Sequence, residues 1–423
     1  MEQLNIQGGR RLEGEISCQG SKNSALPILA STVLTNGINV LHNCPNLSDV
    51  DAAIKILEYL GCKIKKERNT VIVDSRKIEC CDIPENLMHE MRSSIVFLGP
   101  LIGRMGKAYL STPGGCEIGL RPIDLHIKSI KKFGVNVEEG FGKVKCDVKE
   151  KLKGSEIVLS FPSVGATENI MLLASVVEGR TTIINCAREP EIEDLANFLN
   201  KCGAKINGAG TGKITVDGVE KLHSSEYKII PDRIMTATYM ACCAVTQGEI
   251  RINDVCFEHI SPCIPVFLQS GCKIKREKNS IFLKAPKRLK SLGTVRTMPY
   301  PGFPTDFQSP AMTMATVSKG TSLIVENIFE SRYKFVSELV RMGANIKVEG
   351  KVAIVEGVPT LKGATVTSTD LRGGTAIAIA GLCAQGETVM KNLTHIDRGC
   401  EKFSETLESL GARIRREQIP DEK

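Results

Sequence analysis

Tryptophan is absent from this 423-residue chain, histidine occurs six times, and aromatic residues make up only 4% of the sequence. Aliphatic side chains must therefore fill any core. The apolar runs stop well short of the ~20 residues that span a bilayer, and the first residues, MEQLNIQGG, lack a charged-then-apolar signal pattern. No two cysteines have the CxxC spacing of a structural zinc site. These absences argue against membrane insertion and bound metal, and they predict a cytoplasmic enzyme or binding protein.

Cysteine, in contrast, is abundant, with 16 residues. In a short secreted chain this number would indicate a disulfide framework, but a chain of this length without a signal sequence predicts reduced thiols. Cys80 with Cys81 and Cys242 with Cys243 lie in β-like and helix-like apolar runs, and we expect both pairs to be buried as small hydrophobic residues.

The formal net charge of +7 is modest for this length. Three basic runs carry much of it, but none contains an interleaved aromatic residue: KIKKER at 63–68, KIKREK at 273–278 and RIRRE at 413–417. A nucleic-acid surface usually needs a denser single stripe of positive charge. We therefore interpret the runs as solvated strand faces and expect no nucleic-acid partner.

A phrase that joins a helix to a strand recurs six times. Its glycine stands at 61, 134, 203, 271, 343 and 411, with intervals of 68 to 73 residues. A second glycine series, at 37, 106, 179, 248, 320 and 386, precedes the first by 23 to 28 residues. Each unit predicts an amphipathic helix, a glycine turn at the C′ position, a strand, a second helix and a two-stranded hairpin. Six such units predict an α/β fold with two domains of three repeats each.

The start of the first helix in each unit is rich in charged and capping residues. Fourteen or fifteen residues before each turn glycine stand Lys22, Arg92, Gly165, Arg233, Asp306 and Arg372. If equivalent helices point their starts at one region, helix dipoles and basic side chains together form an anion site. Capping alone would explain any one of these positions, and this alternative stays open for each.

The segment STPGGCEIGLRPIDLH places Cys116 after two glycines and five residues before Arg121. The glycines allow a loop to fold over a ligand, and nearby cations lower the pKa of a thiol. Cys116 is therefore a candidate proton donor or nucleophile, with a packed structural cysteine as the alternative. From the residues alone, the prediction is a transferase-like anion cleft with a loop thiol.

Several segments together resemble one enzyme family from end to end. They are SKNSALPILA at 21–30, PGGCEIGLRPIDLH at 113–126, SVGATENIM at 163–171, AREPEIEDLANFL at 187–199, PDRI at 231–234, FPTDFQ at 303–308, STDLRGG at 368–374 and HIDRG at 395–399. The pattern is similar to that of the UDP-N-acetylglucosamine enolpyruvyl transferases. This resemblance implies a two-domain inside-out α/β barrel, with one domain at 22–229 and the other formed by 1–21 plus 230–423.

The resemblance also implies a reaction, the transfer of the enolpyruvyl group of phosphoenolpyruvate to the 3′-hydroxyl of UDP-N-acetylglucosamine. Phosphate is released through a tetrahedral ketal, in the first committed step of peptidoglycan synthesis. The family needs no cofactor and no metal. Its epoxide inhibitor, fosfomycin, would alkylate Cys116.

Residue roles follow from the same resemblance. Cys116 would protonate the methylene carbon or assist the departure of product, and Asp306 would take the sugar hydroxyl proton. Lys22 and Arg398 would act on the phosphate. The phosphoenolpyruvate-binding set would be Lys22, Asn23, Arg92, Arg121, Arg332, Arg372 and Arg398. The UDP-N-acetylglucosamine-binding set would be Asn23, Arg92, Arg121, Pro122, Ile123, Asp124, Leu125, Ser163, Val164, Gly165, Asp306 and Ile328. For Asp306 a pure helix cap is the alternative, and Asp370 is expected to orient Arg372.

The chain departs from the family pattern at two positions. Phe161 stands where many relatives carry a lysine near the diphosphate, and Cys400 replaces a common tyrosine after HIDRG. Three other functions stay in view. These are the sibling transferase of the shikimate pathway, a non-catalytic sugar-nucleotide sensor on the same fold, and a cysteine hydrolase, which would need a histidine beside Cys116.

Overall fold

Six four-stranded sheets of one topology make up the computed structural model, which describes residues 2–112 and 122–418. In each sheet a first strand runs parallel to a second, and two antiparallel strands complete the sheet in the order first, second, fourth, third. These last two strands form a hairpin in five sheets, whereas in the sixth they come from opposite ends of the chain, Glu2–Gln7 and Arg413–Gln418. The described residues divide into two compact units, residues 2–19 with 231–418 and residues 20–112 with 122–230. Each unit contains three sheets, so the sixfold repeat and the α/β class are confirmed.

The unit of residues 20–230 holds three of these sheets. They are β14 (Glu226–Lys228), β3 (Ile38–His42), β5 (Thr70–Asp74) and β4 (Lys63–Glu67); β6 (Asp82–Ile83), β7 (Lys107–Ser111), β9 (Lys143–Asp147) and β8 (Asn136–Gly140); and β10 (Glu156–Val158), β11 (Arg180–Ile184), β13 (Lys213–Asp217) and β12 (Lys205–Asn207). Their first helices are α1 (Lys22–Ser31), the 3₁₀ helix η2 (Arg92–Phe97) continued by α4 (Leu98–Met105), and α6 (Val164–Ala174). Further helices are η1 (Thr32–Leu34), α2 (Ser48–Tyr59), α3 (Glu85–Glu90), α5 (Asp124–Lys131) and α7 (Pro190–Lys201).

The unit of residues 231–418 holds the other three, completed by residues 2–17. They are β2 (Glu13–Ser17), β15 (Glu249–Asn253), β17 (Ser280–Lys284) and β16 (Lys273–Arg276); β18 (Thr294–Arg296), β19 (Thr321–Val325), β21 (Val352–Glu356) and β20 (Asn345–Glu349); and β22 (Thr365–Thr367), β23 (Glu387–Lys391), β1 (Glu2–Gln7) and β24 (Arg413–Gln418). Their first helices are α8 (Arg233–Val245), α11 (Thr305–Thr316) and α13 (Leu371–Cys383). The second helices are α9 (Phe257–Ile260), α10 (Ile264–Gln269), α12 (Val336–Arg341), α14 (Thr394–Asp397) and α15 (Phe403–Ser409).

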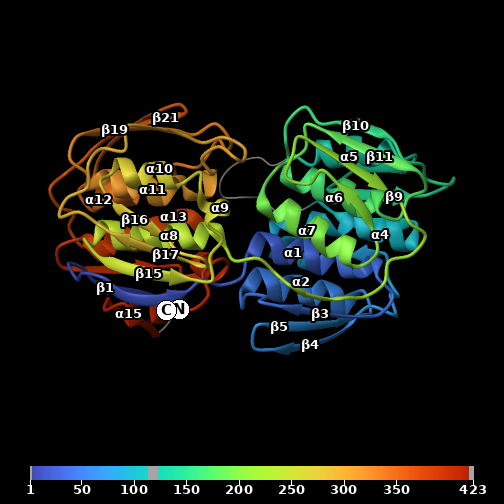
Figure 1. Ribbon diagram of the computed structural model, residues 1–423, viewed down its shortest axis with the longest axis horizontal. Coiled ribbons are helices and arrows are strands. Elements are labelled where there is room, and N and C mark those ends of the chain that lie inside the picture. The colour runs from blue at the N-terminus through green and yellow to red at the C-terminus, as the bar shows by residue number, and fades with distance from the viewer. Residues whose placement is uncertain (1, 113–121, 419–423) are drawn as a thin grey trace. The chain divides into compact units, whose positions relative to one another are not determined.

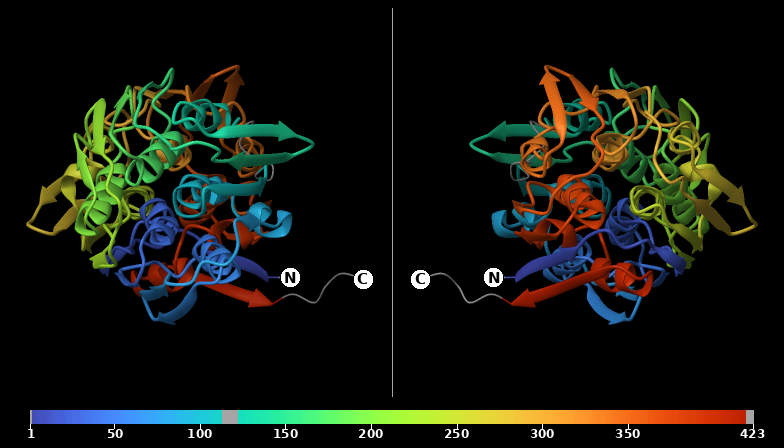
Figure 2. Two further views of the ribbon diagram at one scale, coloured as in Figure 1. Left: turned by 90° about the vertical axis from the view of Figure 1, so that its right-hand side faces the viewer. Right: turned by 90° about the vertical axis from the view of Figure 1, so that its left-hand side faces the viewer.

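The beginning of the chain is built into the unit that otherwise starts at residue 231. Strand β1 pairs with β23 and β24, and β2 runs parallel to β15. Figure 1 shows the blue β1 among the yellow and red elements of that unit, and Figure 2 shows it beside the red β24. Two of the unit's three sheets therefore close only when residues 2–17 are in place.

The first helices are buried on nearly every side, which corrects the expectation of amphipathic helices. All 13 residues of α8 are buried, because this helix packs against β15 and β17 as well as against α11 and α13. Apolar and small residues dominate such a helix around its whole circumference. The sequence also missed the first strand of most sheets, since these strands have only two or three residues in five of the six repeats.

Three other sequence expectations have mixed outcomes. Of the turn glycines expected after the first helices, Gly106, Gly179, Gly320 and Gly386 adopt positive φ, whereas Gly37 and Gly248 do not, so the expectation is confirmed for four of the six. The six glycines that end the second helices all adopt positive φ, from 93° at Gly343 to 105° at Gly61. The basic runs lie in β4, β16 and β24, which are edge strands with exposed lysines and arginines, so their interpretation as solvated faces is confirmed. Cys242 and Cys243 are buried, but Cys80 and Cys81 are half-exposed in an irregular segment, so the expectation that both cysteine pairs are buried is wrong for Cys80 and Cys81.

Within the described ranges 2–112 and 122–418, no helix combines the length and the apolar character that crossing a membrane requires.

Candidate active site

Three helix starts meet in the unit of residues 231–418. The Asp306 carboxylate, in the first turn of α11, accepts hydrogen bonds from Arg332 Nη2 at 2.5 Å and from Arg372 Nη2 at 3.1 Å. Arg372 belongs to the first turn of α13, and Asp232, which caps α8, acts electrostatically on it. The side chains of Arg332 and Arg372 are only 3% and 5% exposed, whereas Asp306 is 26% exposed. Helices that pack side by side thus bring their charged starts together.

The charge on Arg372 is sustained by carboxylates. Burial opposes this charge, but the Asp306 and Asp232 carboxylates outweigh it and raise the pKa of Arg372. The buried Nε of Arg372 has no hydrogen-bond partner among the residues that the structure describes. A buried donor without a partner is costly unless a ligand supplies the acceptor. Two arginines that share Asp306, with one donor unused, therefore favour a bound anion.

The acidic residues at these helix starts have different contacts. Asp370 is the N-cap of α13, and its Oδ1 accepts from the backbone N–H groups of Arg372 and Gly373, both at 3.0 Å. Asp370 therefore orients Arg372 through the backbone of the helix start, by holding its N–H group. Helix α11 has Pro304 as its N-cap and no side-chain capping bond, so Asp306 is not a helix cap.

The segment between β19 and α12 carries Arg332. Its Nε donates to the backbone oxygen of Thr305 at 3.4 Å, and its guanidinium lies 5.4 Å from the centre of the Phe329 ring. Ile328 lies half-buried in the same segment, and its N–H donates to the buried carboxylate of Glu326 at 2.8 Å. Sequence reasoning missed Glu326, because nothing in the repeat distinguishes the residue that follows a strand.

Arg398 follows α14 and is half-buried. The Gln19 side chain forms two hydrogen bonds with the backbone just after Arg398. Its Nε2 donates to Gly399 O at 3.1 Å, and its Oε1 accepts from Glu401 N at 2.8 Å. Cys400 is buried, with its Sγ 3.4 Å from the sulfur of Met235. The turn that carries Arg398 is thus fixed from the N-terminal segment, which no pattern in the sequence indicates.

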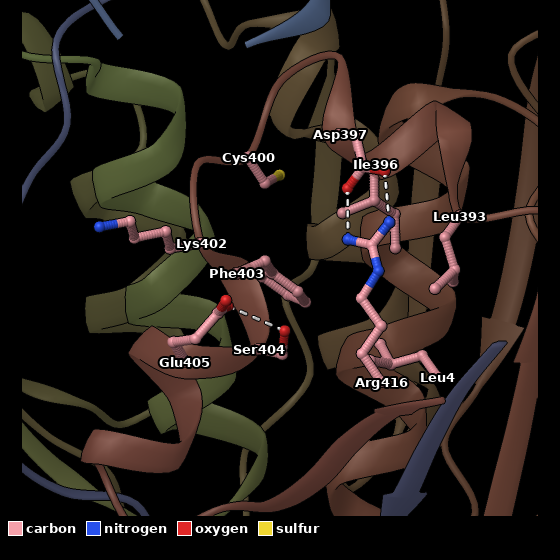
Figure 3. A pocket seen from close by; sticks show the side chains of 10 residues that line it. All are labelled: Leu4, Leu393, Ile396, Asp397, Cys400, Lys402, Phe403, Ser404, Glu405 and Arg416. Carbon is pink, nitrogen blue, oxygen red and sulfur yellow. Dashed lines mark hydrogen bonds and ion pairs between the residues drawn. The ribbon is translucent and has the colours of Figure 1, made fainter. Parts of the chain in front are cut away.

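A pocket lies beside this turn (Figure 3), with a volume of about 130 Å³. Ile396 and Phe403 form part of its apolar wall, and the guanidinium of Arg416 pairs there with Asp397 at 2.7 Å. Ligand pockets usually measure about 300–1,000 Å³. Because the pocket is small and this ion pair is already satisfied, we do not assign substrate binding to it.

In the unit of residues 20–230, Lys22 starts α1 and is buried. Its Nζ lies 2.9 Å from Oδ2 of Asp49, in the first turn of α2, and the two side chains are 9% and 5% exposed. Asn23, next in the chain, is half-buried. Asp49 was also missed from the sequence, since an acidic residue in a first turn is common for helix-dipole reasons alone.

A second group of candidates in this unit surrounds His126. Burial, together with the charge of Arg92, lowers the pKa of His126 to about 4, so the ring is neutral near pH 7. Asn169 Nδ2 donates to His126 Nδ1 at 2.9 Å. A Cβ added at Gly165 would lie 3.0 Å from His126 Cε1. The starts of η2 and α6 therefore both lie close to this ring.

The residues expected at the uridine diphosphate lie around α5 and α6. Ser163 caps α6, with its Oγ accepting from Ala166 N at 3.4 Å, and Val164 and Gly165 follow half-buried in the first turn. Pro122 is exposed, and the three residues after it are half-buried: Ile123, Asp124 and Leu125. Phe161, just before the cap, is 44% exposed. Cys116 and Arg121 lie outside the described residues.

Comparisons with known proteins agree with this reading of the fold. A profile of the EPSP synthase (3-phosphoshikimate 1-carboxyvinyltransferase) family matches residues 6–407. UDP-N-acetylglucosamine 1-carboxyvinyltransferase 2 of Caldanaerobacter subterraneus subsp. tengcongensis is 50% identical, over 98% of this chain and 99% of its own. The enzyme named UDP-N-acetylglucosamine 1-carboxyvinyltransferase from Finegoldia magna is 45% identical over the full length of both chains.

Two solved structures share the fold. The enolpyruvyl transferase NikO from Streptomyces tendae has a TM-score of 0.89 at 24% identity, covering 99% of both chains. EPSP synthase from Acinetobacter baumannii has a TM-score of 0.76 at 17% identity, covering 99% of this chain and 100% of its own. These identities are low enough that they show the fold alone, whereas the 45–50% relatives share the sequence from end to end. The chain therefore belongs to the enolpyruvyl transferase family, within its UDP-N-acetylglucosamine 1-carboxyvinyltransferases.

Proposed function

We propose that this protein transfers the enolpyruvyl group of phosphoenolpyruvate to the 3′-hydroxyl of UDP-N-acetylglucosamine and thereby serves peptidoglycan synthesis. In the first step the sugar oxygen bonds to C2 of phosphoenolpyruvate while C3 gains a proton, which gives a tetrahedral phosphate-bearing ketal. In the second step C3 loses a proton and the C2–O bond to phosphate breaks. Both steps concentrate negative charge on phosphate and carboxylate.

The observation that carries this proposal is the pair of buried arginines at one carboxylate. Arg332 and Arg372 share Asp306, and the Nε of Arg372 has no partner within the described part of the chain. Arginine forks recognise carboxylates and phosphates in two-point geometry. We assign to these two arginines the carboxylate of phosphoenolpyruvate or of the ketal, and to Asp306 the proton of the sugar hydroxyl. A base must first reach its proton, and Asp306 is the more exposed member of this group.

The phosphate is assigned to Lys22, Arg121 and Arg398. Lysine is a mobile point charge, so Lys22 can follow the phosphate as it leaves, while the arginine forks hold its oxygens. Asn23 would hydrogen-bond the ketal and Arg92 would support the carboxylate. These assignments draw on residues of both units, which we propose are the two enolpyruvyl transferase domains.

The sugar nucleotide is assigned to the small-residue start of α6 and to the segment before α5. The backbone N–H groups at Val164 and Gly165 suit a diphosphate because helix starts attract anions. The other proposed contacts are Arg121, Pro122, Ile123, Asp124, Leu125, Ser163 and Ile328. Phe161 supplies no positive charge where many relatives carry a lysine, so we expect the diphosphate to rely more on these backbone groups.

Cys116 is proposed as the proton donor to C3. Support comes from the PGGC segment of the sequence, which resembles that of the family. A thiol that transfers a proton near cations is also a target for epoxides. We therefore expect fosfomycin to add its mass to the peptide that contains Cys116. If fosfomycin abolished activity while the peptide that contains Cys116 gained no mass, this role would be contradicted.

Release of inorganic phosphate tests the function directly. Phosphoenolpyruvate is supplied with UDP-N-acetylglucosamine in one assay and with shikimate 3-phosphate in the other. Phosphate in the first assay only is the expected result. Phosphate in the second only would assign the chain to the sibling reaction, and binding without phosphate release would indicate a non-catalytic sensor.

A further inference from the structure

Glu326 is a buried carboxylate that follows β19, and it has no role in the assignments above. It is 2% exposed, and among the residues that the structure describes its side chain accepts hydrogen bonds from threonine hydroxyls and backbone N–H groups but not from lysine or arginine. A buried carboxylate is costly to desolvate and is retained where hydrogen-bond donors surround it. The four groups that donate hydrogen bonds to Glu326 show which segments of the chain this carboxylate connects.

Three of the donors meet Oε1 and one meets Oε2. Oε1 accepts from Thr297 Oγ1 at 3.0 Å and from the backbone N–H groups of Ile328 and Phe329 at 2.8 and 3.1 Å. Oε2 accepts from Thr305 Oγ1 at 3.0 Å. One oxygen therefore fixes the loop after β19, and the other fixes the first residue of α11.

These two contact points flank the Arg332–Asp306 ion pair. Thr305 directly precedes Asp306, and its backbone oxygen also accepts from Arg332 Nε at 3.4 Å. Ile328 and Phe329 lie in the loop that leads to Arg332, and the Phe329 ring lies beneath its guanidinium. We infer that Glu326 is a positioning residue, which clamps the loop of Arg332 to the start of α11 and so sets the geometry of the Arg332–Asp306 pair. The inference rests on the proposed function for the meaning of that pair.

Substitutions at Glu326 separate geometry from charge. In Glu326→Gln the amide oxygen can accept the same three bonds as Oε1, and the Thr305 hydroxyl can turn to accept from the amide nitrogen. The clamp then survives without the charge. In Glu326→Ala all four bonds are lost, and the loop and the helix start become independent.

Ser322→Ala is the matched control for stability. Ser322 is a buried polar residue near the beginning of β19, the strand that Glu326 follows. Its Oγ accepts from Leu292 N at 3.0 Å. Its loss removes a buried hydrogen bond from the same sheet without touching the clamp. We expect this variant to melt at a lower temperature and to keep the wild-type KM values.

The experiment measures kcat and the KM for phosphoenolpyruvate by phosphate release, well below the melting temperature of each variant. Glu326→Ala should raise this KM about tenfold and lower kcat about tenfold, because a misplacement near 1 Å can cost about 10² in rate. Glu326→Gln should stay within about threefold of wild type in both constants. Partial unfolding would lower kcat alone, so an unchanged KM in Glu326→Ala overturns the inference. A Gln variant as impaired as the Ala variant overturns it as well.

Hydrogen exchange, measured without substrates, keeps this test separate from the proposed function. The amides of Ile328 and Phe329 should lose protection in Glu326→Ala and keep it in Glu326→Gln and Ser322→Ala. Equal protection in all variants would overturn the clamp. A wild-type protein that exchanges as expected but releases no phosphate would instead refute the proposed function and leave the clamp standing.

Discussion

The two units share one topology of three repeats, but they differ in what stands at the starts of their buried helices. In the unit of residues 231–418, charged side chains meet: Asp306 joins Arg332 and Arg372, and Asp232 acts on the same cluster. In the unit of residues 20–230, Lys22 and Arg92 start α1 and η2, but the start of α6 presents Ser163 and small residues.

The residues packed around the helix starts of the unit of residues 20–230 also differ from those in the other unit. A neutral histidine, His126, lies beside the start of α6, and the Lys22–Asp49 pair belongs to α1 and α2. A repeated scaffold can therefore place equivalent backbone positions in each unit while single residues give each position different chemistry. Charged side chains suit a small, dense anion, and exposed backbone N–H groups suit an extended diphosphate.

The largest expected effect breaks the charged cluster. Arg372→Met removes one of the two arginines that share Asp306, and kcat/KM for phosphate release should fall by about 10³ or more, because truncating one partner of a buried charged pair costs 2–5 kcal/mol or more. Arg341→Met is the control, since Arg341 is exposed on α12 and lies 3.8 Å from Glu338. A loss of less than tenfold in Arg372→Met would show that the cluster is only structural.

The corresponding change in the other unit is Asp49→Asn. It leaves the buried ammonium of Lys22 without this carboxylate, and kcat/KM should fall about 10²-fold through poor placement of the ammonium. Asp51→Asn on the same helix is the matched control, because its pair with Lys66 is largely solvated. Unaltered kinetics in Asp49→Asn would mean that the Lys22–Asp49 pair does not position the lysine for catalysis.

The neutral histidine predicts a dependence of stability on pH. The pKa of His126 is lowered to about 4 in the folded chain, compared with an unfolded value of 6.5, so the unfolded chain binds more protons between these values. Stability should therefore fall as the pH drops through this window. Between pH 7.5 and 5 the loss should be about 2 kcal/mol larger in wild type than in His126→Gln.

Urea unfolding at the two pH values measures this difference. His89→Gln, at an exposed histidine, should retain the wild-type pH dependence. Identical pH dependence in wild type and His126→Gln would show that the ring does not remain neutral on acidification.

The smallest expected effect tests the scaffold that the units share. Gly134 and Gly343 are equivalent glycines at the ends of α5 and α12, with φ of 96° and 93°, and an added Cβ would meet nothing within 4 Å at either. Alanine at either position should cost about 1 kcal/mol of folding stability through left-handed strain alone, and kcat/KM should not change. Clearly unequal shifts in the urea midpoint would show that the equivalence of the repeats does not extend to their turns.

Much of the scaffold could be predicted from single residues and their spacing. The glycine phase located six repeats, and the positions counted back from the turn glycines fall in the first turns of α1, η2, α6, α8, α11 and α13. Local chemistry explains this success, since glycine is required for left-handed turns and capping residues mark helix starts. The pairing of Asp306 with Arg372 could not be predicted, because 66 residues separate them and only the packing of α11 on α13 brings them together.

The sequence by itself determined the number of repeats, the helix starts and, through the family pattern, the residue types available for chemistry. Tertiary structure alone decided that Asp370 caps a helix while Asp306 pairs with two arginines. It also decided that Asp49 pairs with Lys22 and that Glu326 accepts hydrogen bonds from four donors. The physical reason is that turns and caps depend on neighbouring residues, which sequence records. Ion pairs and buried hydrogen bonds depend on which helices and strands pack together, and this is fixed only when the whole core forms.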